Sequence, residues 1–306
     1  MRSSGTLMCL ASGIGFGAMA VFGKLSYDEG ATVGTLLVVR FGLAAVLFWL
    51  LLAARRSLGE ARMLTRRDLG LGLALGAAGY ALQAGGYFAA LERIDASLLA
   101  LILYTYPAMV AGAALAIGRE RLNGRKVAAL LLASSGLVLV LAGAGAGALD
   151  PLGAALGLGA AMIYTTYILV SERVVGRVRP HVLSAIVCTG ATASLLVGTT
   201  LLGEFRPGDL TAAGWGWLAC LAVISTVGAV SLFFAGLDRV GPTAASILST
   251  VEPVVTVVLA FLVFGEVLGA VQLLGGALVL AAVVVLNARW NRRLREREEA
   301  IGSAPA

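Results

Sequence analysis

Charged residues are scarce in this chain of 306 residues: Asp, Glu, Lys and Arg together make up 13% of it. A typical soluble domain carries about 25% charged residues, so the composition excludes an ordinary soluble fold. Apolar residues occupy 59% of positions, and the mean hydropathy is +0.93. These values predict a protein that folds in lipid, where helices satisfy their own backbone polar groups.

Residues that support catalysis or metal binding are equally rare. His181 is the single histidine, and Cys9, Cys188 and Cys220 lie in separate apolar stretches without paired spacing. Such spacing predicts neither a disulfide nor a metal site, and a single clear mid-membrane carboxylate gives an enzyme little to work with. No basic face with interleaved aromatics is present, so we expect no nucleic-acid partner. Because residues suited to catalysis and metal binding are scarce, we expect no cofactor and no enzymatic activity.

Ten apolar runs of about twenty residues divide the chain, each the length that crosses a bilayer as a helix. Strand alternation is absent from them. The first run is too long for the apolar core of a signal peptide and lacks a clear cleavage site, so we expect a retained helix. The predicted spans are 5–25, 33–54, 70–91, 97–117, 127–147, 152–171, 182–203, 214–237, 243–264 and 267–288.

An internal repeat is the strongest pattern in the sequence. Pro107 and Pro253 are 146 residues apart, and the same offset aligns neighbouring positions such as Glu92 with Asp238 and Glu120 with Glu266. The repeat predicts one unit over residues 1–147, a second over 148–288, and a cytosolic tail over 289–306. Five helices per unit is an odd number, so the second unit enters the membrane upside down. The fold class expected is therefore an all-α membrane protein with ten transmembrane helices in two inverted five-helix repeats, a design suited to alternating access.

Basic residues indicate the orientation of these helices. With the N-terminus inside, nineteen Arg and Lys residues lie on the cytoplasmic side and three on the other, while Arg40 falls within a span. This bias predicts a multi-pass protein of the plasma (inner) membrane with both termini in the cytoplasm. The lipid bilayer, with its anionic headgroups, is then the natural partner of the net charge of +6; the oligomeric state stays open.

The repeated stretches point to a known family. Residues 79–141 and 231–286 share an aromatic-rich helix, a short loop, a helix with a central proline, a closing Gly-Glu or Arg-Glu and a Gly-rich helix. The second copy contains Glu252-Pro253 and Gly265-Glu266, whereas the first has Tyr106-Pro107 and Arg119-Glu120. This order resembles the EamA domain of the drug/metabolite transporter (DMT) superfamily over nearly the whole chain.

The resemblance implies a secondary transporter that exports a small organic metabolite by alternating access. Family members handle amino acids, sugars, nucleotide sugars, organic phosphates and drug-like molecules, so the substrate stays open, as does coupling to protons. An uncoupled facilitator or importer is one alternative, and a non-transporting membrane scaffold or accessory subunit is another. A water-accessible centre would favour transport, and a dry, packed centre the scaffold.

Two charged residues are candidates for a site inside the membrane. Glu252 lies about ten residues into its span, where a charge costs roughly 2.5–3.5 kcal/mol; it either couples protons or binds substrate, or it fastens two helices together. Arg40 either binds an anionic group or pairs with a carboxylate such as Glu252, or its head snorkels to the outer interface. Lys24, at the end of the first span, is interpreted as an interfacial anchor, with the extracellular vestibule as the alternative.

Aromatic and polar residues at similar depths complete the predicted site. Spacings of three and four keep them on common helix faces, which suits a cavity for an amphipathic organic solute, although ordinary packing is the alternative for each. Pro107 and Pro253 are predicted to kink two spans, as gates, site lining or plain architectural bends. The other candidates are Phe16, Met19, Tyr80, Gln83, Tyr87, Tyr104, Tyr106, Tyr164, Tyr167, Ser249 and Thr250.

Overall fold

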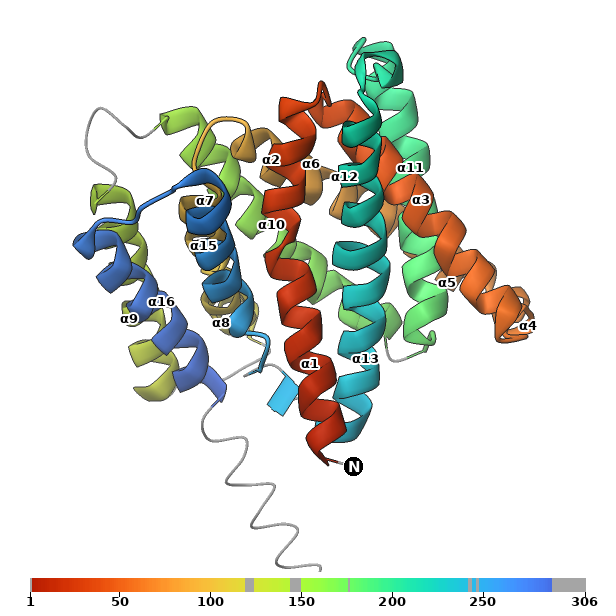
Figure 1. Cartoon of the computed structure of the whole chain (residues 1–306). Helices are drawn as coiled ribbons and strands as arrows, with labels where there is room; N and C mark the ends of the chain where they lie inside the picture. Colours follow the sequence, from red (N-terminus) through yellow and green to blue (C-terminus); the bar gives the residue numbers. More distant parts are fainter. Residues whose placement is uncertain are drawn as a thin grey trace, which may run out of the picture.

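The computed structural model describes residues 2–118, 124–143, 150–175, 177–241, 244–245 and 248–287. These residues fold into helices joined by short connections (Figure 1). The Arg119-Glu120 pair, the predicted boundary at 147–148 and the predicted tail 289–306 lie outside the described residues. In chain order the elements are α1 (Arg2–Gly17), α2 (Met19–Asp28), α3 (Val33–Ala54), α4 (Leu58–Arg62), α5 (Arg66–Ala74), η1 (Leu75–Tyr80), α6 (Ala81–Leu91), α7 (Ala96–Leu103), α8 (Tyr106–Ala116), α9 (Gly124–Gly143), α10 (Pro151–Val175), α11 (Pro180–Leu201), η2 (Pro207–Asp209), α12 (Ala212–Ala222), η3 (Val223–Gly228), α13 (Ala229–Val240), α15 (Val251–Phe264) and α16 (Ala270–Asn287).

The described helices confirm a multi-pass membrane protein. Seven helical segments are long and apolar enough to cross a bilayer, and two shorter apolar helices, Val251–Phe264 and Ala270–Val285, follow them. The predicted run 70–91 is helical as well, from Arg66 to Leu91 through α5, η1 and α6. The seven segments are Ser4–Asp28, Val33–Ala54, Ala96–Ala116, Gly124–Gly143, Pro151–Ser171, Pro180–Leu201 and Ala212–Val240.

The two mid-membrane prolines follow helix breaks rather than bends within continuous helices. A turn at Tyr104 and Thr105 separates α7 from α8, and a turn at residues 249–250 precedes α15. Pro107 and Pro253 therefore lie in the first turns of α8 and α15. A proline fits there because the first N–H groups of a helix have no intrahelical partner to lose.

Two π-helical segments occupy matching positions in the two halves of the chain. η1 covers residues 75–80 and η3 covers residues 223–228, an offset of 148. Each is six residues long and lies between two α-helical segments that continue it. π-helical turns commonly occur at functional sites, and η3 contributes Thr226 to the site described below.

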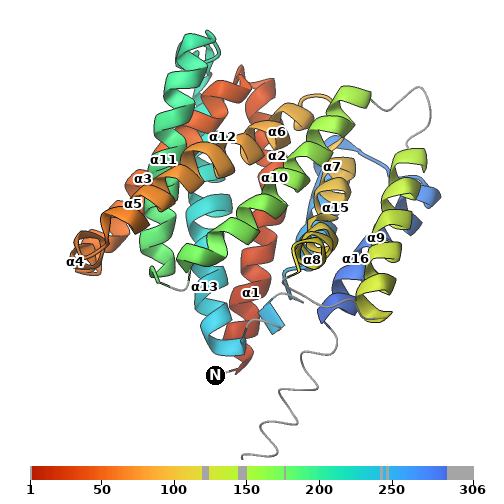
Figure 2. The same cartoon turned by 180° about the vertical axis from the view of Figure 1, so that it is seen from behind.

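Helix pairs build the bundle. α3 packs on α11, α1 on α13 and α6 on α10, whereas α9 and α16 pair with each other at one side of the molecule (Figures 1 and 2). Phe41, Phe48 and Phe88 are fully buried at the centre of the larger group. The candidate site lies in the group of helices around α3, α6 and α10.

Close backbone contact of α5 and η1 with α11 yields a stability prediction. A Cβ at Gly76 would lie 2.0 Å from the carbonyl oxygen of Val187, and one at Gly190 2.3 Å from that of Leu73. Because backbone cannot yield as a side-chain tip does, we expect Gly76→Ala to lower the free energy of unfolding by about 1–3 kcal/mol. Gly85→Ala is the matched control, since its Cβ would meet nothing within 4 Å. Thermal unfolding in detergent measures both, and equal midpoints would contradict the packing.

Candidate functional site

Arg40 is buried inside the helix bundle. Its side chain on α3 is 3% exposed, and its Nε donates a hydrogen bond of 3.0 Å to the Thr226 hydroxyl of η3. The guanidinium lies 5.0 Å from the ring centroid of Phe41 and 5.3 Å from that of Phe88, so both rings can stabilise its charge. This placement contradicts the snorkelling interpretation. Within the described part of the chain, no carboxylate forms an ion pair with Arg40.

Five tyrosines form a continuous chain of ring contacts that starts beside Arg40. Distances here are between ring centroids. The ring of Phe41 lies 5.1 Å from that of Tyr80, and Tyr80 stacks on Tyr167 of α10 at 5.6 Å. From there Tyr167 contacts Tyr164 at 6.2 Å, Tyr164 contacts Tyr106 of α8 at 4.6 Å, and Tyr106 contacts Tyr104 at 5.9 Å. Residues from segments far apart in the sequence thus form one continuous series of tyrosine rings.

Glu252 lies at the other end of this tyrosine chain. The Tyr104 hydroxyl donates a hydrogen bond to the carbonyl of Ser249, and the amide of Glu252 donates to the same carbonyl at 3.0 Å. Glu252 is partly buried in the first turn of α15, where the positive end of the helix dipole favours a carboxylate. The tyrosine chain therefore leads from the buried cation on α3 to the backbone at the start of α15, where Glu252 lies.

The remaining predicted residues lie around this chain or apart from it. Tyr87 and Gln83 are buried on α6, and the Tyr87 ring contacts Phe88 at 5.2 Å. Thr250 is the residue before α15. Phe16 and Met19 lie on either side of Ala18, where α1 gives way to α2, and no ring contact among the described residues joins Phe16 to the tyrosines.

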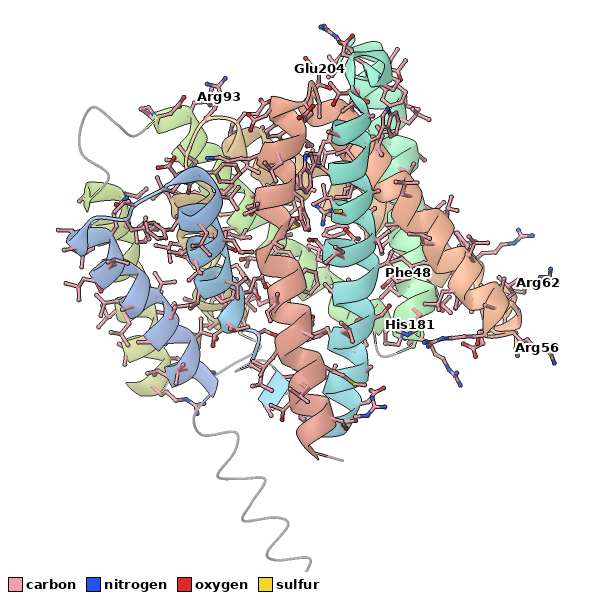
Figure 3. All side chains as sticks on the ribbon, in the orientation of Figure 1. Phe48, Arg56, Arg62, Arg93, His181 and Glu204 are labelled. Atoms are coloured by element: carbon pink, nitrogen blue, oxygen red, sulfur yellow. The ribbon has the colours of Figure 1, made fainter. Side chains whose placement is uncertain are left out.

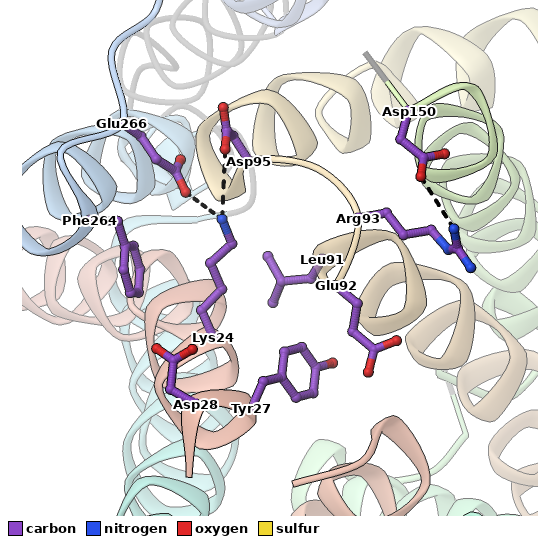
Figure 4. A pocket seen from close by; sticks show the side chains of 10 residues that line it. All are labelled: Lys24, Tyr27, Asp28, Leu91, Glu92, Arg93, Asp95, Asp150, Phe264 and Glu266. Atoms are coloured by element: carbon purple, nitrogen blue, oxygen red, sulfur yellow. Dashed lines mark hydrogen bonds and ion pairs between the residues drawn. The ribbon is translucent and has the colours of Figure 1, made fainter. Parts of the chain in front are cut away.

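A cavity of about 890 Å³ opens at the end of the bundle opposite the N-terminus, the end where Figure 3 labels Arg93 (Figures 3 and 4). We call this cavity the vestibule. Figure 4 shows Lys24, Glu266 and Asp95 on one side of it and the Arg93–Asp150 ion pair, 3.2 Å long, on the other. Its lining comprises Lys24, Tyr27, Asp28, Leu91, Glu92, Arg93, Asp95, Asp150, Phe264 and Glu266.

Glu266 joins three helices in the wall of the vestibule. One carboxylate oxygen accepts from Lys24 Nζ at 2.6 Å and from the amide of Ala96 at 3.1 Å, and the other accepts from the amide of Ser97 at 2.9 Å. Glu266 thereby caps the N-terminus of α7 from another part of the chain, since Asp95 makes no side-chain cap of its own. The side chain of Glu266 is 6% exposed and that of Lys24 22%. Helix α2, the start of α7 and the segment just after α15 thus meet at this one carboxylate.

The environment of Glu266 leads to a pH prediction. Burial by itself raises the pKa of Glu266, but the hydrogen bond from Lys24 and the amides of Ser97 and Ala96 outweigh it and hold the pKa below its usual range. A carboxylate with a lowered folded pKa contributes stability above its unfolded pKa of about 4.3, and that contribution is lost as pH falls through the folded pKa. We expect the melting temperature of the wild type to fall more steeply below about pH 5 than that of Glu266→Gln.

Glu92 is the control for that measurement. Burial, and then the nearby Glu204, raise the pKa of Glu92, so its ionisation opposes folding and its protonation at low pH relieves this cost. The Glu92→Gln variant should therefore lose stability more steeply on acidification than the wild type, the opposite sign from Glu266→Gln. Parallel pH profiles for all three proteins would contradict the assignment.

Comparison with known proteins decides the family. The EamA-like transporter family model matches residues 3–142 and again residues 151–288. This chain belongs to the EamA-like transporter family. The two matches confirm two EamA repeats, and the family is one of transporters rather than enzymes, as the composition and the resemblance predict.

Several relatives support this assignment. The chain is 27% identical over 280 residues to the uncharacterized transporter YcbK of Bacillus subtilis (strain 168), covering 89% of each protein. It is 28% identical over 204 residues to an uncharacterized transporter of Archaeoglobus fulgidus, covering 67% of this chain and 72% of the relative. A crystal structure with a TM-score of 0.67 and 20% identity, which covers 96% of this chain and 99% of its own, shares the fold.

Glu266 is the main residue of the vestibule whose role the sequence does not predict. The repeat aligns it with Glu120 and the family pattern includes Gly265-Glu266, but neither signal predicts its contact with Lys24, 242 residues away in the chain. Thr226 was missed as well, because a single threonine in an apolar helix gives no pattern.

Proposed function

We propose that this EamA-like protein is a secondary transporter that exports a small organic solute through a site formed by Arg40, the tyrosine chain and Glu252. The observation that carries the proposal is the series of contacts that runs from Arg40 through Phe41 and five tyrosines to the backbone of Ser249 and Glu252. Intramembrane charges that lack an ionic partner are expensive and mark solute or ion pathways. A membrane scaffold would have no need of a buried arginine that pairs with no carboxylate in the described part of the chain.

The transport cycle follows from an arrangement of ten transmembrane helices in two inverted repeats, over residues 1–147 and 148–288. Corresponding segments of the two EamA repeats run in opposite directions in Figure 1: α7 and α8 run away from the vestibule, whereas α15 runs toward it. The matching π-helical segments η1 and η3 also support the repeat. Exchange of conformation between such repeats opens the central site to each side in turn.

The proposed location is the inner membrane, with both termini in the cytoplasm. Figure 3 places Arg56 and Arg62 toward the end of the bundle that carries the N-terminus and Arg93 at the vestibule end. The nineteen-to-three distribution of basic residues favours the N-terminal side as cytoplasmic. The vestibule then faces outward, and the Lys24–Glu266 junction forms part of an outer gate.

The chemistry of the site favours a solute with an anionic or strongly polar group beside an apolar or aromatic body. The Arg40 guanidinium offers charge-assisted hydrogen bonds, and the tyrosine rings offer apolar faces with polar tips. Uptake of radiolabelled amino acids, organic acids and other metabolites into proteoliposomes, with and without a proton gradient, tests the proposal. Accumulation of at least one such solute above protein-free liposomes is expected. Failure of every solute, in protein that remains folded, would favour the scaffold.

Proton coupling rests on Glu252 and has its own test. Proton carriers commonly use a carboxylate inside the membrane, and Glu252 is the acidic residue at the start of α15. The Glu252→Gln variant keeps the size of the side chain but cannot exchange a proton, so we expect it to lose acceleration of transport by a pH gradient. Solute-driven exchange without a gradient should persist. Full transport with unchanged pH dependence in Glu252→Gln would end the coupling hypothesis.

A further inference from the structure

A second cavity, about 240 Å³ in volume, lies between α4 and the connection from α10 to α11. Leu64, Val178 and Val182 give it an apolar lining, and Arg177 and Arg179 contribute charge to its edge. Met63 also lines it and is 86% exposed. An apolar cavity beside basic residues is suited to an amphiphile more than to a free ion.

The charge around this cavity is strongly positive. Residues 55–68 contain five arginines, and Arg177 and Arg179 add two more, whereas Glu60 and Asp68 are the carboxylates of these segments. Both carboxylates already have a partner: Arg179 lies 2.9 Å from Glu60, and Arg177 lies 4.0 Å from Asp68. The two segments together therefore carry a net charge of about plus five. The lining of the cavity itself holds Arg177, Arg179 and Glu60, so most of the excess charge comes from the arginines of residues 55–68, and it can attract an external anion to this corner.

The position of α4 identifies the kind of anion. α4 connects the apolar helix α3 to α5, so it lies where helices leave the membrane. Figure 3 shows Arg56 and Arg62 projecting from this corner of the bundle, away from the other helices. An exposed methionine and exposed arginines side by side match the depth at which acyl chains meet phosphate groups.

We propose that the cavity between α4 and the α10–α11 connection, with the arginines around it, binds the headgroup of an anionic phospholipid. The arginines contact the phosphate, and Met63 with the apolar lining contacts the glycerol and upper acyl region. The site is independent of the solute pathway, because none of the residues that line it belongs to the tyrosine chain or the vestibule.

The test is a lipid titration of the full chain in detergent micelles, read as the melting temperature. Phosphatidylglycerol should raise it in a saturable manner, whereas phosphatidylcholine and inorganic phosphate should not. The Arg62→Gln/Arg177→Gln variant should need about 30-fold more phosphatidylglycerol for half-saturation, from about 1 kcal/mol per arginine. The matched Arg206→Gln/Arg239→Gln variant removes two exposed arginines elsewhere. It should change the phosphatidylglycerol concentration for half-saturation less than threefold.

Two further measurements keep the outcome clear. The Arg62→Lys/Arg177→Lys variant keeps the charge and should stay within about fivefold of the wild type, and 0.5 M NaCl should weaken binding to the wild type itself. The proposal would be overturned if the two glutamine variants needed the same phosphatidylglycerol concentration for half-saturation. An equal response to phosphatidylcholine, or saturation by inorganic phosphate alone, would also overturn it. The absence of any phosphatidylglycerol response in the wild type would do so as well.

Discussion

Transport by Arg40→Gln is expected to fall about 10- to 100-fold while the melting temperature stays within a few degrees of the wild type. The size of this loss in transport rate follows from the roughly 1.5–3 kcal/mol that a hydrogen bond to a charged group contributes. Initial rates of solute flux in proteoliposomes measure the loss, at equal amounts of reconstituted protein.

We expect the Arg40→Gln variant to lose transport activity but not stability, because of the contacts that Arg40 makes. Its described contacts are the Thr226 hydroxyl and the faces of Phe41 and Phe88, with no carboxylate among them. Removal of a buried charge that has no ionic partner costs folding little and can even stabilise the protein. The charge is therefore explained better by a solute than by the fold.

Two companion variants make the Arg40 result specific. Thr226→Val removes the hydroxyl that orients the guanidinium but leaves the charge, so its transport defect should be smaller than that of Arg40→Gln. Arg40→Lys keeps the charge without the planar donor geometry and should also transport more slowly than the wild type. Transport by Arg40→Gln at the wild-type rate would remove Arg40 from the proposed site.

Glu266→Ala is expected to lower the free energy of unfolding by about 3 kcal/mol, the largest stability effect among the charged residues of the vestibule. Removal of one partner from a buried ion pair costs about 3–5 kcal/mol. Partial exposure of Lys24 reduces that figure, while loss of the acceptor for the first amides of α7 adds about 1 kcal/mol. Chemical or thermal unfolding in detergent gives the value.

Arg93→Ala provides the contrast for the Glu266 experiment. It breaks the Arg93–Asp150 pair on the other side of the same vestibule, where the side chains are 44% and 33% exposed. Exposed ion pairs contribute about 0–1 kcal/mol, so this variant should unfold close to the wild type. If the two variants lose equal stability, the Lys24–Glu266 junction does not hold α2, α7 and α15 together.

Apolar run length, composition and family pattern predicted the helical membrane fold because they depend on local sequence alone. The same patterns single out Arg40, the tyrosines and Glu252 as candidates, since polar groups inside apolar helices are conspicuous. They could not predict the order of the ring contacts, which depends on how α3, α8 and α10 pack. The sequence also does not predict the π-helical turns or the helix break at Tyr104, because one extra residue in a turn hardly changes hydrophobic periodicity.

Lys24 shows a different limit of sequence reasoning. A lysine at the end of an apolar helix is typical of an interfacial anchor, and only the fold brings it to Glu266 and the start of α7. Contacts across 242 residues arise from tertiary structure, so no local pattern contains them.

Cysteine labelling at Tyr106 tests the central claim most directly, because Tyr106 lies within the tyrosine chain, between Tyr164 and Tyr104. Tyr106→Cys would be made after replacement of Cys9, Cys188 and Cys220 by alanine, in protein reconstituted into liposomes. A membrane-impermeant thiol reagent should label Cys at this position from the outside and, in a separate sample, from the lumen, and added solute should slow both reactions. A position that reacts from neither side would mean a dry, packed centre and would contradict transport through this site.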